Sequence, residues 1–153
     1  MRAEDYARKL FRLIDIMKIP IDLTPILKAY NIEVQEESFA NLLGVTFKTK
    51  NFNLIVINKN LPARQKFFTL AHEIAHIVMP HKGTTNICQI GKNKLMEQSA
   101  NRFAAELLMP YPTLKKLWDE YKSNPEYRIS ILADMFGVSY EAMKTRIKTL
   151  GLC

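Results

Sequence analysis

The sequence contains few cysteines. Only two, Cys88 and Cys153, occur among its 153 residues, and they do not form the closely spaced pairs of a cysteine zinc site. A disulfide framework would need more cysteines, so we expect a reducing compartment. Neither residue is a good metal ligand, because Cys88 stands alone in a polar stretch and Cys153 ends the chain.

The sequence also lacks a long apolar run. No run approaches the roughly 20 residues that a membrane-spanning helix needs, and residues 1–5 do not begin a signal peptide. We therefore expect a cytoplasmic protein without a membrane partner. The chain has no internal repeat, and its 48% of hydrophobic residues are enough for one domain with its own core.

Histidine is scarce as well, yet all three histidines lie between positions 72 and 81. His72 and His76 enclose Glu73 in the motif His-Glu-Ile-Ala-His. On a helix the two histidines share one face, about 5 to 6 Å apart at Cβ, and can bind one small cation, for which zinc is best suited. Glu73 lies about 100° around the helix, where its carboxylate can take a proton from a metal-bound water. The alternative is a pair of hydrogen-bonded core histidines with Glu73 in solvent.

The residues around this motif predict a buried helix. Residues 63–79 contain no glycine or proline, and they follow a possible cap, Asn60, and a proline at a first-turn position, Pro62. Their apolar positions cover most of the helix circumference. Buried imidazoles and carboxylates are costly unless they are hydrogen-bonded, paired or bound to a metal, so this context favours the metal site.

A catalytic zinc usually has three protein ligands, so a third must come from elsewhere in the chain. A second helix, predicted over residues 97–109, offers Glu97 and Glu106. These two glutamates lie on opposite sides of the helix and cannot both face the histidines. We choose Glu97, because Asn101, one turn later, can then accept the outer ring proton of a ligand histidine. Glu106 is expected on the helix surface or behind the ligands. Alternatively, Glu97 is an ordinary first-turn acid favoured by the helix dipole.

Together the two motifs resemble the ImmA/IrrE-type metallopeptidases, which are zinc proteases with a glutamate as third ligand. Residues 68–76, Phe-Thr-Leu-Ala-His-Glu-Ile-Ala-His, are similar to the family's active-site helix. Residues 97–110, Glu-Gln-Ser-Ala-Asn-Arg-Phe-Ala-Ala-Glu-Leu-Leu-Met-Pro, are similar to its second motif almost throughout. The resemblance extends over residues 43–110 and includes Arg64, at a basic position common in the family. Residues 74–75 depart from it, because many members have a glycine there.

This resemblance implies an α+β fold, a mainly helical zincin-like domain with a small β-sheet before the active-site helix. It implies one zinc ion (Zn2+) bound by His72, His76 and Glu97, with Glu73 as the catalytic glutamate. The implied reaction is cleavage of a repressor-type transcription regulator. The same ligands also admit manganese, iron or cobalt.

The reaction would also need a group that stabilises the oxyanion. His81, Tyr111 and Arg102 are candidates, because each lies near a motif in the sequence. His81 follows Pro80, so we expect it on a loop after the helix, where a solvated histidine without a role is an equal interpretation.

Before the active-site helix the pattern predicts two helices and a small sheet. One helix covers residues 3–17. A shorter one covers residues 24–30, with Thr24 as its cap and Pro25 in its first turn, and stops at Asn31. Strands are predicted over residues 32–35, 44–48 and 53–57. As the resemblance implies, an edge strand near the cleft can pair with an extended substrate. Residues 53–57 are our candidate for it, and an interior strand is the equal alternative.

The C-terminal part predicts a helix-turn-helix pattern, with helices over residues 129–136 and 140–150. The second helix carries Lys144, Arg146 and Lys148, and the chain has a net charge of +7, so direct DNA binding is possible. Against it, one such motif gives little contact area, and helix pairs of this kind occur in folds that do not bind DNA. We prefer a role in completing the core and docking the substrate.

These observations give an ordered set of hypotheses. The first is a zinc endopeptidase acting on a helix-turn-helix repressor, with a peptidase domain over residues 1–125 and a helical extension packed on it over residues 126–153. The second is a DNA-binding regulatory protein with a structural or vestigial metal site, and the third is a scaffold without activity. Glu73 discriminates between them, because a structural site has no use for a carboxylate beside its ligands.

Overall fold

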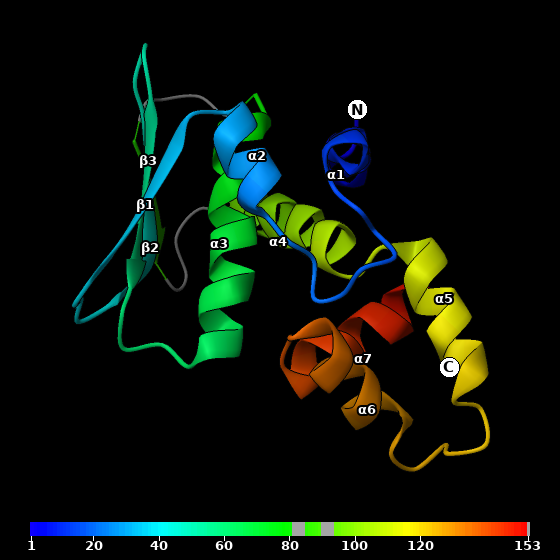
Figure 1. Cartoon of the computed structure of the whole chain (residues 1–153). Helices are drawn as coiled ribbons and strands as arrows, with labels where there is room; N and C mark the ends of the chain where they lie inside the picture. Colours follow the sequence, from blue (N-terminus) through cyan, green and yellow to red (C-terminus); the bar gives the residue numbers. More distant parts are fainter. Residues whose placement is uncertain (81–84, 90–93, 153) are drawn as a thin grey trace.

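The computed structural model describes residues 1–80, 85–89 and 94–152, with the backbone alone for 85–89 and 94. A β-sheet lies on one side of the molecule, and the described helices lie on the other (Figure 1). The fold is therefore α+β and mainly helical, as predicted. The strands are β1 (Ile32–Glu37), β2 (Leu42–Lys48), β3 (Asn53–Asn58) and β4 (Thr85–Gln89). The α-helices are α1 (Ala3–Lys9), α2 (Thr24–Ala29), α3 (Ala63–Val78), α4 (Lys94–Leu108), α5 (Tyr111–Glu120), α6 (Arg128–Phe136) and α7 (Tyr140–Thr149).

The N-terminal helix is shorter than the apolar pattern predicted. α1 ends at Lys9, and a 3-10 helix (Leu10–Leu13) continues it. Beyond that point the Asp15 carboxylate accepts a hydrogen bond from the backbone N–H of Met17 at 3.0 Å, a local bond that competes with helix formation. α2 stops as predicted, because Asn31 adopts a left-handed φ of 53°.

Two predicted helix caps are wrong. The residue that caps α2 is Leu23, and Thr24 is already inside the helix. The residue that caps α3 is Pro62, not Asn60. With φ fixed near its helical value, Pro62 can start the helix without a side-chain hydrogen bond.

The sheet has the strand order β1-β3-β2-β4. β3 is parallel to β1, whereas β2 is antiparallel to both β3 and β4. The three predicted strands are present, but β4 was not predicted. The proposal that residues 53–57 form an edge strand is wrong, because β3 pairs on both sides and its backbone groups are used. Its buried run Ile55–Ile57 is typical of a central strand.

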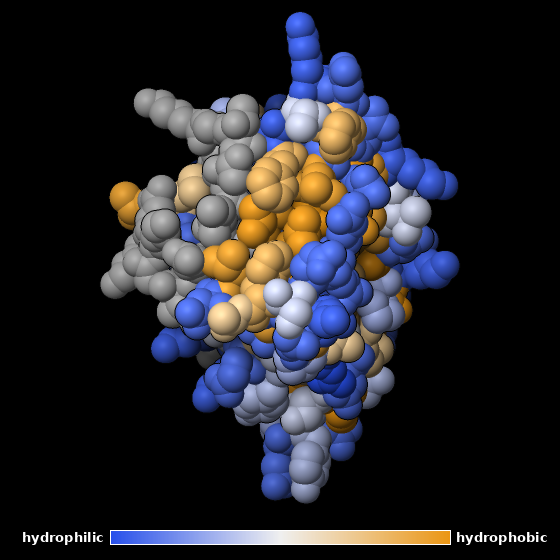
Figure 2. Space-filling view, turned by 90° about the vertical axis from the view of Figure 1, so that its left-hand side faces the viewer, coloured by the Kyte–Doolittle hydropathy of each residue, from blue (hydrophilic) through white to orange (hydrophobic). Residues whose placement is uncertain are grey.

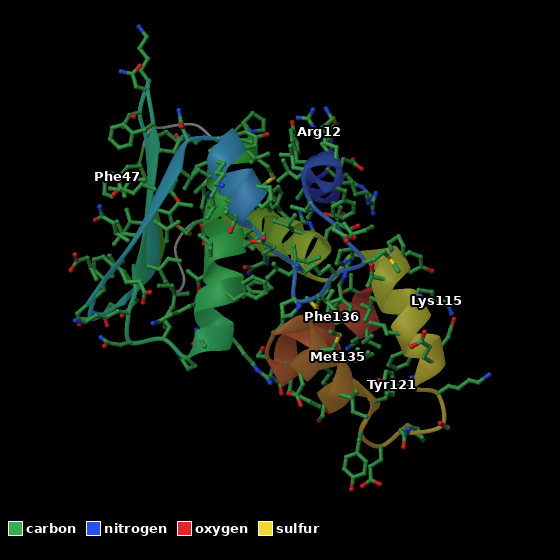
Figure 3. All side chains as sticks on the ribbon, in the orientation of Figure 1. Arg12, Phe47, Lys115, Tyr121, Met135 and Phe136 are labelled. Carbon is green, nitrogen blue, oxygen red and sulfur yellow. The ribbon has the colours of Figure 1, made fainter. Side chains whose placement is uncertain are left out.

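α3 packs on one face of the sheet, against β2 and β3. In Figure 1 the opposite face carries no described helix. Phe47 lies on that open side in Figure 3 and is 37% exposed. Figure 2 shows apolar residues gathered at the centre of this side of the molecule. The buried core lies on the helical side of the sheet, where α3 packs between α4 and the strands β2 and β3.

The C-terminal helices complete the helical side. α5 was not predicted, but α6 and α7 agree with the predicted helix-turn-helix pattern. Gly137, between them, has a φ of 71°, and a Cβ there would lie 3.3 Å from Pro20 Cγ, so the turn requires glycine. Phe136 is fully buried among the helices (Figure 3).

One residue of the basic set on α7 is not available to DNA. Arg146 is 5% exposed, whereas Lys144 and Lys148 are exposed. Counting Arg146 as part of a DNA-binding face was therefore wrong. None of the helices in the part of the chain that the structure describes is long and apolar enough to cross a membrane.

Candidate metal centre

His72, His76 and Glu97 converge where α3 meets the first turn of α4. The Nε2 atom of His72 lies 2.7 Å from Glu97 Oε2, and that of His76 lies 3.3 Å from Glu97 Oε1. One ligand atom from each residue lies within 4.8 Å of the other two. The two nitrogens and one oxygen can therefore surround one small cation, a donor set compatible with zinc.

The surroundings of Glu97 favour the ionised form of its carboxyl group. Burial opposes ionisation of Glu97, but the hydrogen bonds and charges of His72 and His76 outweigh burial and hold the pKa of the carboxyl well below its usual range. Burial likewise opposes the charged form of His72, but its bond to Glu97 and the charge of Glu73 raise the pKa of the imidazole. Glu97 is therefore ionised at neutral pH, the form in which a carboxylate binds metal.

Asn101 lies one helical turn after Glu97 and contacts the outer side of His72. Its Oδ1 atom is 2.7 Å from His72 Nδ1. With Nδ1–H donating to this oxygen, the lone pair of Nε2 is directed toward the shared centre. The contact is the one expected from the sequence, and the role of Asn101 in fixing the ring tautomer stays a prediction.

Glu73 is completely buried and lies beside the ligand set. The Thr46 hydroxyl, on β2, donates to Glu73 Oε1 at 2.8 Å. Thr46 is also fully buried, so this bond forms in a low-dielectric environment, where it holds the carboxylate in one orientation. The alternative interpretation, with Glu73 pointing to solvent, is wrong.

Gly44 gives Glu73 the space it occupies. A Cβ atom at position 44 would lie 3.2 Å from Glu73 Cγ and 3.2 Å from the carbonyl oxygen of Val56. Sequence reasoning missed both Gly44 and Thr46. The sequence did contain a signal for them. Gly44 and Thr46 are two residues apart in a predicted strand and therefore point to the same face of the sheet, and a glycine within a strand often marks a place where another group approaches the backbone closely.

The structure does not bring Arg102 or Tyr111, two of the three oxyanion candidates, to this centre. Arg102 lies 3.3 Å from Glu4 and donates to Ser99, and its side chain is 52% exposed. Tyr111 begins α5, beyond the far end of α4, and the helical rise puts it roughly 20 Å along the chain from Glu97. His81 lies outside the described residues.

Glu106 differs from its prediction. It is 1% exposed, so it does not lie on the helix surface. It pairs with Arg146 and Arg8, about 13 Å along the helix from Glu97. It is therefore an internal ion-pair residue at the opposite end of α4.

A comparison with solved structures supports the fold of the chain. A solved structure of a Mycobacterium tuberculosis transcriptional regulator is similar in fold, with a TM-score of 0.60 and 15% sequence identity. The match covers 95% of this chain and 46% of the regulator, so this chain spans less than half of that protein. No match was found among curated protein sequences.

The sequence itself matches a protein family. Residues 27–148 match the peptidase M78 family, described as the IrrE N-terminal-like domain. This range contains every residue of the candidate metal centre and most of the C-terminal helices. The chain therefore belongs to the IrrE N-terminal-like family of metallopeptidases.

Proposed function

We propose that this chain is a zinc-dependent endopeptidase, in which His72, His76 and Glu97 hold one zinc ion and Glu73 is the general base. The observation that carries the proposal is the buried carboxylate of Glu73, held by Thr46 next to the three converging ligands. A purely structural zinc site is closed by four ligands and needs no such neighbour.

The residues support a division of roles. When bound, zinc would polarise the peptide carbonyl and lower the pKa of a water molecule. Glu73 takes one proton from the attacking water as its oxygen bonds to the carbonyl carbon, and delivers it to the amine as the C–N bond breaks. Thr46 keeps the Glu73 carboxylate oriented, and Asn101 keeps the tautomer of His72.

β4 takes the place of residues 53–57 as the candidate for substrate pairing. Thr46 of β2 is the register partner of Asn86 in β4, so this edge strand is adjacent to the strand that holds Glu73. Among the described strands β4 pairs only with β2, which leaves its second backbone edge for an extended peptide.

The proposed substrate is a repressor-type transcription regulator with a helix-turn-helix domain. Membership of the peptidase M78 family supports this assignment. Direct DNA binding by α7 has weaker support, because Arg146 is buried in an ion pair with Glu106.

The test combines metal analysis with cleavage. Wild type and Glu73→Gln are loaded with zinc and incubated with the repressor-like regulator encoded nearest the gene, and the fragments are identified by mass spectrometry. Cleavage by wild type alone, with one equivalent of zinc in both proteins, is the expected result. Equal cleavage by both would exclude Glu73 as the base, and absence of bound zinc from both would remove the central claim.

A further inference from the structure

Arg146 of α7 joins the C-terminal helices to the far end of α4. One of its guanidinium nitrogens pairs with Glu106 Oε2, and its Nε donates to the carbonyl oxygen of Met109 at 3.1 Å. Met109 directly follows α4, so Arg146 satisfies a carbonyl at the negative end of that helix. The buried Arg146 side chain thus holds both the Glu106 side chain and the C-terminal backbone of α4.

Glu106 connects a third element to the same point. Its other oxygen, Oε1, accepts a hydrogen bond from Arg8 Nε of α1 at 3.1 Å. Glu106 and Arg146 are almost completely buried, whereas the Arg8 side chain is 47% exposed. One carboxylate therefore holds α1 and α7 to α4.

A second arginine joins the C-terminal helices to α3. Arg64, in the first turn of α3, donates from Nη1 to the carbonyl oxygen of Val138 at 3.1 Å and pairs with Asp134 of α6. Arg64 precedes His72 by eight residues, about 12 Å along the helix. In Figure 1, α6 and α7 accordingly lie beside the end of α3 at which it begins.

The two helices that carry the candidate ligands are thus attached to the same helix pair. α3 carries His72 and His76, and α4 carries Glu97. A tilt of α4 relative to α3 would move Glu97 away from the histidines. Because metal ligands must be positioned within tenths of an ångström, the attachment at the far ends bears directly on the metal centre.

We propose that α6 and α7 brace the metal centre and that Arg146 is a positioning residue for Glu97, acting through Glu106 and the Met109 carbonyl. This inference rests on the proposed metal site. A buried ion pair gives little net stability compared with apolar residues of similar volume, and in some proteins it fixes one arrangement of the packed elements instead. Here the arrangement is the position of α4 against α3.

The test separates positioning from stability. Removing Arg146 alone would leave the buried Glu106 charge with Arg8 as its remaining partner, which destabilises the fold whether or not the metal centre is affected. The informative variant is therefore Arg146→Met combined with Glu106→Met, which removes both charges and keeps the side-chain volumes similar. Arg146→Lys is the conservative variant. It keeps the positive charge but cannot contact Glu106 and the Met109 carbonyl through two separate nitrogens.

A matched control lies in the same helices. Arg128 of α6 donates from Nε to the carbonyl oxygen of Trp118 at 2.8 Å and stacks on the Trp118 ring. It joins α6 to α5 and makes none of the contacts that hold α3 or α4. Arg128→Met therefore weakens the attachment of α6 to α5 and leaves the Arg64 and Arg146 contacts to α3 and α4 in place.

The zinc dissociation constant is measured by competition with a chelating dye, and thermal unfolding of the metal-free protein is followed alongside. We expect the double variant to fold and to bind zinc about tenfold more weakly, Arg146→Lys to lie between it and wild type, and Arg128→Met to bind zinc like wild type. Unchanged zinc affinity in the folded double variant, or an equal loss in Arg128→Met, would overturn the proposal. If wild type binds no zinc, the proposed function itself fails. That result differs from the two outcomes that would overturn only the role of Arg146.

Discussion

At the scale of single residues, Thr46 controls the environment of the proposed base. Its hydroxyl donates a hydrogen bond to Glu73 Oε1, and both side chains are fully buried. Thr46→Val keeps the shape but leaves a buried carboxylate oxygen without this donor, which costs about 1–3 kcal/mol. We expect kcat to fall by about tenfold to a hundredfold with zinc content unchanged. Steady-state kinetics with the identified substrate measure this, and Thr46→Ser, which keeps the hydroxyl, should retain most of the activity. A loss of activity in the Ser variant, with activity retained in the Val variant, would show that the methyl group matters instead of the hydroxyl.

Gly44 provides a second prediction at this scale. Gly44→Ala places a methyl group 3.2 Å from both Glu73 Cγ and the Val56 carbonyl oxygen, so we expect a loss of about 1–3 kcal/mol in the free energy of unfolding. Urea denaturation measures it. In a Glu73→Ala background one of the two close contacts disappears, and the same substitution should cost less. Additive losses would mean that Glu73 is not the group that Gly44 accommodates.

At the scale of elements, α4 serves the centre with two residues one turn apart, Glu97 and Asn101. Asn101→Leu removes the acceptor for His72 Nδ1, which frees the ring to adopt the other tautomer. We expect zinc affinity to fall by about tenfold to a hundredfold, measured by chelator competition. Asn101→Asp retains an acceptor and should bind zinc nearly as well as wild type. If Leu and Asp variants bind equally, the contact does not orient the ring.

Elements were predictable from the sequence where a local pattern defines them. The helices around residues 72 and 97, and the pair α6 and α7, have clear apolar periodicity or a glycine turn. β4 has no such pattern, because its five residues become a strand only by pairing with β2. α5 starts with Pro110 as its cap and Pro112 in its first turn, and sequence reasoning took Pro110 only as the end of the preceding helix, although proline also starts helices.

Residues of the candidate site were also predictable where they are close in the sequence. One helical turn brings together His72, Glu73 and His76, and another brings together Glu97 and Asn101, so the spacing within each helix predicts which of these side chains lie near one another. Thr46 and Glu73 are 27 positions apart, and their contact depends on how the sheet packs against α3. The Arg146–Glu106 pair spans 40 positions, and periodicity within either helix carries no information about it.

At the scale of the whole molecule, the proposed zinc ion would join the sheet-bound helix α3 to α4, which packs on α1. Binding to the folded state alone adds stability in proportion to the logarithm of free zinc over the dissociation constant, about 2.7 kcal/mol at a hundredfold excess. Wild type and Glu73→Gln should therefore gain thermal stability equally when zinc is added, because Glu73 is not a ligand in the proposal. Glu97→Gln, which lacks the carboxylate that contacts both histidines, should gain much less. Differential scanning fluorimetry over a zinc titration measures all three. A loss of the zinc-dependent shift in Glu73→Gln, with the shift retained in Glu97→Gln, would exchange the roles of the two glutamates.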